Sequence, residues 1–215
     1  MPFYYYFIIA SFLVSLFLYK QPATEVYLKL FTPFLGLTIL VEIYGLYLRN
    51  HGQRNLQLYS YFTTIEFVFY LYIISCVIQK QKLRVAIRYI SIFNALMALT
   101  NILFIQKNGF NTISYSLSCL LVVFFCIYYF LELFRNPKFV NLKSDPAFWI
   151  CSGLLFYYCC SFPLVGVLSF LSSVPRSLLN NLFLLVNVIN TLLYTSFMIA
   201  FVCRIVNRRP VSLPS

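Results

Sequence analysis

The stretch LQLYSYFTTIEFVFYLYIISCVI, residues 56–78, is apolar over almost its whole length. It contains one acid, Glu66, and no Lys or Arg. At ~1.5 Å per residue, a helix of this length exceeds the ~30 Å hydrocarbon core of a bilayer. Residues 56–78 therefore predict a membrane-spanning helix.

Six similar stretches lie on either side of this one, at residues 4–19, 27–48, 85–106, 110–133, 148–170 and 178–203. The breaks between them are short and rich in Lys, Arg, Pro, Gly and Asn, so none has room for a soluble domain. A barrel is excluded, because its strands would alternate in polarity over roughly 10 residues. We predict an all-α polytopic membrane protein, with residues 1–206 as a single seven-helix transmembrane bundle and residues 207–215 as a short basic cytoplasmic tail.

The composition supports this class. Hydrophobic residues make up 61% of the 215 residues and charged residues 10%, and the mean hydropathy is +0.84. A soluble domain has about a quarter of its residues charged. The net charge of +11 would suggest a nucleic-acid partner in a soluble protein. Here the cations lie between apolar spans, so we expect the lipid bilayer as the partner and no nucleic acid.

The cations also predict an orientation. If the N-terminus is outside, the four external cations are Arg49, Arg54, Lys107 and Arg176, and the other twelve of the 16 lie on the cytoplasmic side. Since Lys and Arg are retained in the cytoplasm, this bias predicts an external N-terminus and a cytoplasmic C-terminus. No cation precedes the first span, which argues against a cleaved signal peptide. The expected location is the cell membrane, which is the cytoplasmic (inner) membrane if the source is a bacterium.

Only five acids are present. Glu25 and Asp145 fall at helix ends, and Glu132 is three residues before Arg135, where an ion pair along one helix is the simplest role. Glu42 and Glu66 lie inside apolar spans, where a carboxylate costs a few kcal/mol and is a functional candidate. The two lie at similar depth in consecutive helices. If their carboxyls meet, they either share a proton or hold a cation between them.

Polar side chains follow one face of several spans, as expected for helices that turn these faces inward. We predict a polar pocket, reachable from outside, among the second, third, fourth and seventh spans. Its candidate ligand-, ion- or proton-binding residues are Glu42, Glu66, Tyr70, Asn94, Asn101, Asn187 and Asn190. The alternative for the Asn residues is a structural role, in which they bond across helices and stabilise the bundle.

The sequence lacks the residues that known seven-helix proteins use for their chemistry. The last span has no Lys for a retinal, and one His cannot supply a three-His zinc site. No nucleophile, metal or phosphate-loop motif occurs, so we predict no catalytic residue, metal or cofactor. The basic inner loops form a candidate docking surface for a cytoplasmic or membrane protein partner, through Lys80, Lys82, Arg84, Arg135 and Lys138.

Three short segments carry a resemblance: Glu42-Ile43-Tyr44-Gly45, the stretch from Tyr59 to Glu66, and Pro146-Ala147-Phe148-Trp149-Ile150. In these segments the chain resembles bacterial seven-helix integral membrane proteins of unknown function. The resemblance implies no activity, but it draws attention to Glu42 and Glu66.

We therefore expect a non-enzymatic protein that binds a small cationic, protonated or neutral ligand for sensing or transport. A second hypothesis is a structural or assembly subunit of a membrane complex, whose polar faces only join helices. A third is an intramembrane enzyme that acts on lipid with Glu42 and Glu66 as acid and base.

Overall fold

The computed structural model describes residues 2–21, 24–106, 109–135, 142–170 and 176–206. This part of the chain is helical and contains no strand. Its α-helices are α1 (Tyr4–Tyr19), α2 (Val26–Lys29), α3 (Phe31–Asn50), α4 (Leu56–Val77), α5 (Gln81–Thr100), α6 (Thr112–Arg135), α7 (Pro146–Phe170) and α8 (Arg176–Val206). A π-helical segment, Asn101–Ile105, continues α5, and a short 3-10 turn, Leu142–Ser144, precedes α7.

The all-α class is confirmed, and all seven apolar stretches are largely helical. Residues 27–48 cover most of α2 and of α3, and residues 85–106 cover most of α5 and the π-helical segment. Six helices in the described residues are long and apolar enough to cross a membrane: Val26–Asn50, Leu56–Val77, Gln81–Ile105, Thr112–Arg135, Pro146–Gly166 and Asn181–Val206. The first helix, α1, is shorter. Its bounds are those predicted for the first span, but its 16 residues cover ~24 Å, less than the ~30 Å core that a spanning helix must cross.

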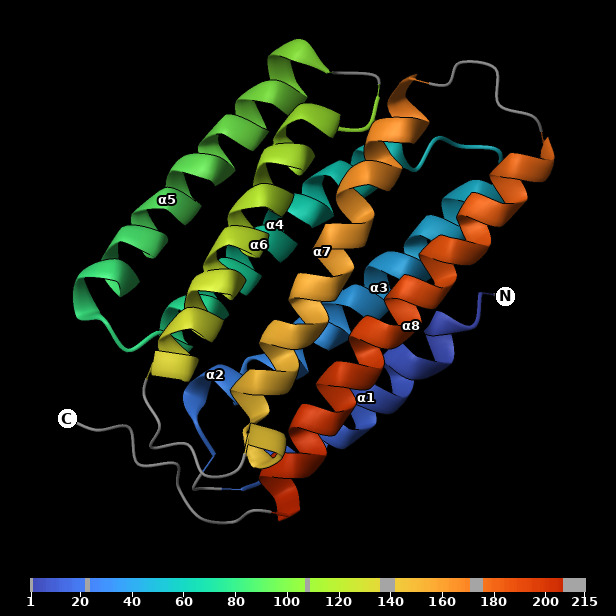
Figure 1. The fold of residues 1–215 in the computed structure, drawn as a ribbon. Coiled ribbons are helices and arrows are strands. Elements are labelled where there is room, and N and C mark those ends of the chain that lie inside the picture. The colour runs from blue at the N-terminus through green and yellow to red at the C-terminus, as the bar shows by residue number, and fades with distance from the viewer. Residues whose placement is uncertain (1, 22–23, 107–108, 136–141, 171–175, 207–215) are drawn as a thin grey trace.

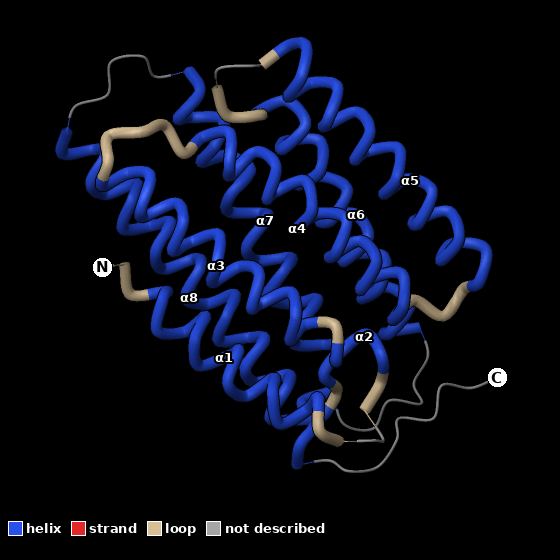
Figure 2. The backbone as a smooth tube through the Cα atoms, turned by 180° about the vertical axis from the view of Figure 1, so that it is seen from behind, coloured by secondary structure: helices blue, strands red, loops and turns tan. Residues whose placement is uncertain are grey.

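The helices run side by side in one bundle, with α5 at one edge and α1 at the other (Figures 1 and 2). Helix α8 packs against α7 and α1, α7 packs against α6, and α4 packs against α5 and α6. Helices α3 and α4 follow each other in sequence but touch less than α1 and α3 do. This sparse contact leaves space between α3 and α4 toward the end where their connecting loop lies.

The outer surface of the bundle is apolar. On the α5 side, Tyr89 is 70% exposed, Phe93 64% and Phe104 73%. Side chains of this size and polarity would be unfavourable in water over so large a surface, but they suit contact with lipid tails. The outward apolar face and the helix lengths together identify an integral membrane protein.

A cluster of aromatic rings fills the interior. Phe31 of α3 lies 5.1 Å from Phe69 of α4 and 5.1 Å from Phe197 of α8, measured between ring centroids, in edge-to-face contacts. Tyr70 and Tyr158 join this cluster, and neither is accessible to solvent. Such ring pairs contribute about 0.5–1.5 kcal/mol each beyond their buried area. The cluster joins α3, α4, α7 and α8 in the interior of the bundle.

Helices α7 and α8 approach closely at Gly153. A Cβ atom built on Gly153 would lie 2.7 Å from Cβ of Ser196, too close for two carbon atoms. Small residues at such crossings let helix backbones pack in the absence of water. Gly166, on the same helix, has no atom within 4 Å of the corresponding position.

We therefore expect Gly153→Ala to lower the free energy of unfolding by about 1–3 kcal/mol, because the added methyl group must separate α7 from α8. Gly166→Ala is the matched control and should leave stability unchanged. Thermal unfolding of the purified protein in detergent measures both effects. Equal stability of the two variants would contradict a close crossing at Gly153.

Candidate functional site

A cavity of about 470 Å³ lies between α1, α3, α4 and α8 at the end of the bundle that carries the α3–α4 loop. Its lining runs from Pro2, Arg49 and Asn55 near the bundle end to Glu66 and Tyr194 in the interior. The remaining lining residues are Tyr4, Tyr5, Glu42, Gly45, Leu46, Leu56, Tyr59, Phe62, Thr63, Phe110, Tyr157, Phe183, Val186, Asn187 and Asn190. Both acids of the apolar spans therefore face one cavity.

Glu42 of α3 is held by two phenols. The Tyr5 hydroxyl of α1 donates a hydrogen bond to Oε2 of Glu42 at 3.1 Å, and the Tyr59 hydroxyl of α4 donates to the same oxygen at 3.0 Å. Gly45 makes this possible, since a Cβ atom there would lie 2.6 Å from the Tyr59 hydroxyl. Glu42 thus joins α1, α3 and α4 at the cavity wall.

Glu66 of α4 lies deeper and is 8% exposed. Tyr157 of α7 and Tyr194 of α8 line the same cavity as Glu66. Tyr70, one turn along α4 from Glu66, is fully buried, and its hydroxyl lies beside the Glu66 carboxyl. Glu66 therefore sits at the base of the cavity, directly above the aromatic cluster.

The structure brings four of the seven candidate residues to the cavity: Glu42, Glu66, Asn187 and Asn190. The amide Nδ2 of Asn190 donates to the carbonyl of Val186 at 2.9 Å, one turn back along α8. Asn187 is half-buried on the same wall. Tyr70 does not line the cavity and lies behind Glu66 in the aromatic cluster.

Asn94 and Asn101 lie elsewhere, in contacts between α5 and α6. Asn94 donates from Nδ2 to the Ser118 hydroxyl at 2.7 Å. Asn101 donates to Oδ1 of Asn111 and to the Ser114 hydroxyl. Among the described lining residues α5 contributes none, whereas α1, which we did not expect at the pocket, contributes Tyr4 and Tyr5.

Sequence reasoning missed most of the aromatic wall. Tyr4 and Tyr5 have the pattern of interfacial anchors, because they begin an apolar span. Tyr59 could have been identified as a wall residue from the sequence, because it shares a helical face with Glu66. Tyr194 shares the polar face of the last span with Asn187 and Asn190, so the sequence also carries a signal for it. Tyr157 lies in an apolar and aromatic run without such a signal, and only the packing of α7 places it at the cavity.

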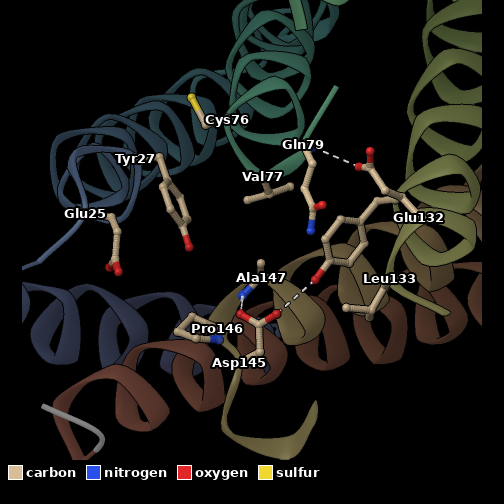
Figure 3. Close-up of a pocket in the computed structure, with 11 residues that line it drawn as sticks. Glu25, Tyr27, Cys76, Val77, Gln79, Glu132, Leu133, Asp145, Pro146 and Ala147 are labelled. Atoms are coloured by element: carbon tan, nitrogen blue, oxygen red, sulfur yellow. Dashed lines mark hydrogen bonds between the residues drawn. The ribbon is translucent and has the colours of Figure 1, made fainter. Parts of the chain in front are cut away.

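The other three acids gather around a second, smaller cavity of about 60 Å³ at the opposite end of the bundle (Figure 3). Each has a structural partner. Glu25 pairs with Arg204 of α8, with Oε2 3.1 Å from Nε. Glu132 accepts a hydrogen bond from the Gln79 backbone N–H at 2.8 Å. The expected Glu132–Arg135 ion pair is absent from the described residues, because Glu132 instead satisfies the α4–α5 turn.

Asp145 begins α7. Its Oδ1 accepts the Ala147 backbone N–H at 3.0 Å, its Oδ2 accepts the Tyr129 hydroxyl at 3.1 Å, and Pro146 follows at the first helical position. This is the pattern of a helix N-cap. Burial raises the pKa of the Asp145 carboxyl, and the two hydrogen bonds oppose that rise. The three acids at this end therefore have structural roles, in which they stabilise helix ends and their connections.

Several of the cations predicted to form a docking surface also lie at this end. Lys80, Lys82 and Arg135 are exposed, and Arg84 is half-buried with its Nε donating to the carbonyl of Ile78. Lys138 lies outside the described residues. The arrangement places exposed positive charge at the end of the bundle opposite the larger cavity.

No group of three or more His, Cys, Asp or Glu side chains suited to a metal ion occurs within the ranges that the structure describes. Comparison of the chain with known protein families, curated proteins and solved structures found no match. Any function must therefore be argued from the site itself.

Proposed function

We propose that this membrane protein binds a small cationic ligand in the larger cavity, with its N-terminus and the cavity mouth outside the cell, and that binding serves sensing or transport. The observation that carries the proposal is the placement of Glu42 and Glu66 on the wall of one cavity. Two carboxyls at membrane depth repel anions and favour a positive charge between them. A protonated or neutral hydrogen-bonding ligand would use the same groups.

Among the described residues, one basic side chain lines the cavity, that of Arg49, which is exposed near the bundle end. Arg49 lies two turns from Glu42 on α3, near the bundle end, whereas Glu66 lines the interior of the cavity. Among the described lining residues, the positive charge is therefore at the mouth and the deeper carboxyl lies away from it. This arrangement supports a binding position for positive charge near Glu66.

The distribution of cations supports the orientation. The opposite end of the bundle carries Lys80, Lys82 and Arg135 with exposed side chains, and a cytoplasmic location suits them. In a sensing role, this basic surface would contact an acidic partner. In a transport role, the buried rings of Tyr70 and Tyr158, which do not line either cavity, would have to move to let a ligand pass.

The test is thermal unfolding of the purified protein in detergent, with increasing concentrations of K⁺ and of alkylammonium salts. A ligand at 100 times its Kd stabilises the folded state by about 2.7 kcal/mol, so binding raises the unfolding midpoint. We expect this rise in the wild type and its loss in the double variant Glu42→Gln plus Glu66→Gln. Since a proton competes for the same carboxyls, the rise should also weaken as the pH is lowered.

Glu132→Gln is the control, because it makes the same change at a half-buried acid outside the cavity. Cations should stabilise this variant as they do the wild type. If they act equally on all three proteins, general salt effects explain the result and the proposal is wrong. Uptake of the stabilising cation into vesicles that contain the protein separates transport from sensing.

A further inference from the structure

The wall of the larger cavity is unusually rich in aromatic rings. Eight of its 20 lining residues are aromatic: Tyr4, Tyr5, Tyr59, Phe62, Phe110, Tyr157, Phe183 and Tyr194. These rings come from different parts of the chain and line the same cavity as the two carboxyls. Ring faces carry partial negative charge and attract a cation that has been stripped of water.

An inorganic cation would be poorly served by this wall. Metal ions such as Ca²⁺ need about six or more oxygen ligands gathered at one point. The carboxyl, amide and phenol oxygens of this wall come from residues distributed around a cavity of about 470 Å³. The described residues hold no cluster of metal-binding side chains. In addition, 470 Å³ is the size of a small-molecule pocket rather than that of an ion site.

The two carboxyls also differ in what they already bind. Oε2 of Glu42 accepts both the Tyr5 and the Tyr59 hydroxyls, so Glu42 holds two rings of the wall in place. Glu66 lines the interior of the same cavity, as Tyr157 and Tyr194 do, and the phenol beside its carboxyl is Tyr70, which does not line the cavity. Glu66 is therefore the group that faces a bound cation, and Glu42 is a positioning residue.

We infer that the ligand is an alkylated ammonium ion, bound with its charge at Glu66 and its alkyl groups against the rings of Tyr157 and Tyr194. This inference rests on the proposed function and names the chemical class of its ligand. A carboxylate surrounded by aromatic rings provides charge and apolar contact at once, which an alkylammonium group needs and an alkali ion does not. Glu42 contributes indirectly, by fixing Tyr5 and Tyr59.

The experiment measures the Kd values of three probes for the detergent-solubilised protein by calorimetry: tetramethylammonium, K⁺ and uncharged neopentyl alcohol. Tetramethylammonium should bind at least about tenfold more tightly than either of the others, because only it combines charge with alkyl groups. Glu66→Gln should abolish this preference. Glu42→Gln should keep it, because the amide oxygen of Gln still accepts the two phenol hydrogen bonds.

Variants of the wall test the contribution of the rings. Tyr157→Leu and Tyr194→Leu should each weaken tetramethylammonium binding about tenfold, whereas Tyr157→Phe and Tyr194→Phe, which keep the ring, should remain within about threefold of the wild type. Tyr89→Leu is the control, since Tyr89 is exposed on the outer face of α5. The use of two positions protects the test if one Leu variant does not fold.

The outcomes separate the inference from the proposed function. If K⁺ binds as tightly as tetramethylammonium and still depends on Glu66, the cation site stands and the alkylammonium inference is overturned. The inference is also overturned if both Leu variants bind tetramethylammonium as the wild type does. If no cation binds the wild type, the proposed function itself fails.

Discussion

Replacement of Glu25 by Gln is expected to lower the free energy of unfolding by about 3 kcal/mol, because it removes the carboxylate beside a buried guanidinium. Arg204 is 3% exposed, and its Nε lies 3.1 Å from Oε2 of Glu25. Loss of one member of a buried ion pair is costly, because the remaining charge stays away from water with less compensation. This expected loss of stability is at the lower end of the range for broken buried ion pairs, since the Glu25 side chain is 25% exposed.

The double variant Glu25→Gln plus Arg204→Met distinguishes this cause from a simple loss of packing. It removes both charges, so it should recover part of the stability lost in Glu25→Gln alone. Thermal or SDS unfolding of the purified protein measures the three variants. If Glu25→Gln changes stability by less than about 0.5 kcal/mol, as surface substitutions do, the pair does not link α8 to the start of α2 in solution.

The helices were predictable because hydropathy and length are local properties. The break at Lys20-Gln21-Pro22 and the one at Arg49-Asn50-His51-Gly52 each separate two helices of the structure. The sequence could also predict that Glu42 and Glu66 share one cavity, because consecutive helices joined by a short loop place residues of similar depth near each other.

The neighbours of the cavity were not predictable. The expectation for Asn94 and Asn101 assumed that a polar face of α5 turns toward the acids, but α5 lies at the edge of the bundle and bonds to α6. Helix α1 reaches the cavity because it packs against α3 and α8, and α8 is far away in sequence. Likewise, Glu25 and Arg204 are joined only by the folded chain. Nothing local in a sequence encodes such pairings.

A labelling experiment is expected to give an all-or-none result for the orientation of the bundle. Gln53 and Gln81 are both exposed and lie just before and just after α4, whose 22 residues separate them by ~33 Å along its axis. With the proposed orientation, the single variant Gln53→Cys should react with a membrane-impermeant thiol reagent in intact cells. Gln81→Cys should react only after the membrane is permeabilised.

The two variants control for each other, because each makes the same Gln→Cys change at an exposed position. The seven native cysteines are all free within helices, so the unmodified protein gives the background of the assay. The reverse pattern, with Gln81→Cys reactive in intact cells, would place Lys80 and Lys82 outside and contradict the charge bias that supports the orientation. The cavity of Glu42 and Glu66 would then open to the cytoplasm, and its ligand would be an intracellular cation. Because Gln53 lies in the loop beside the cavity mouth, the experiment assigns the side of the membrane from which Glu66 is reached.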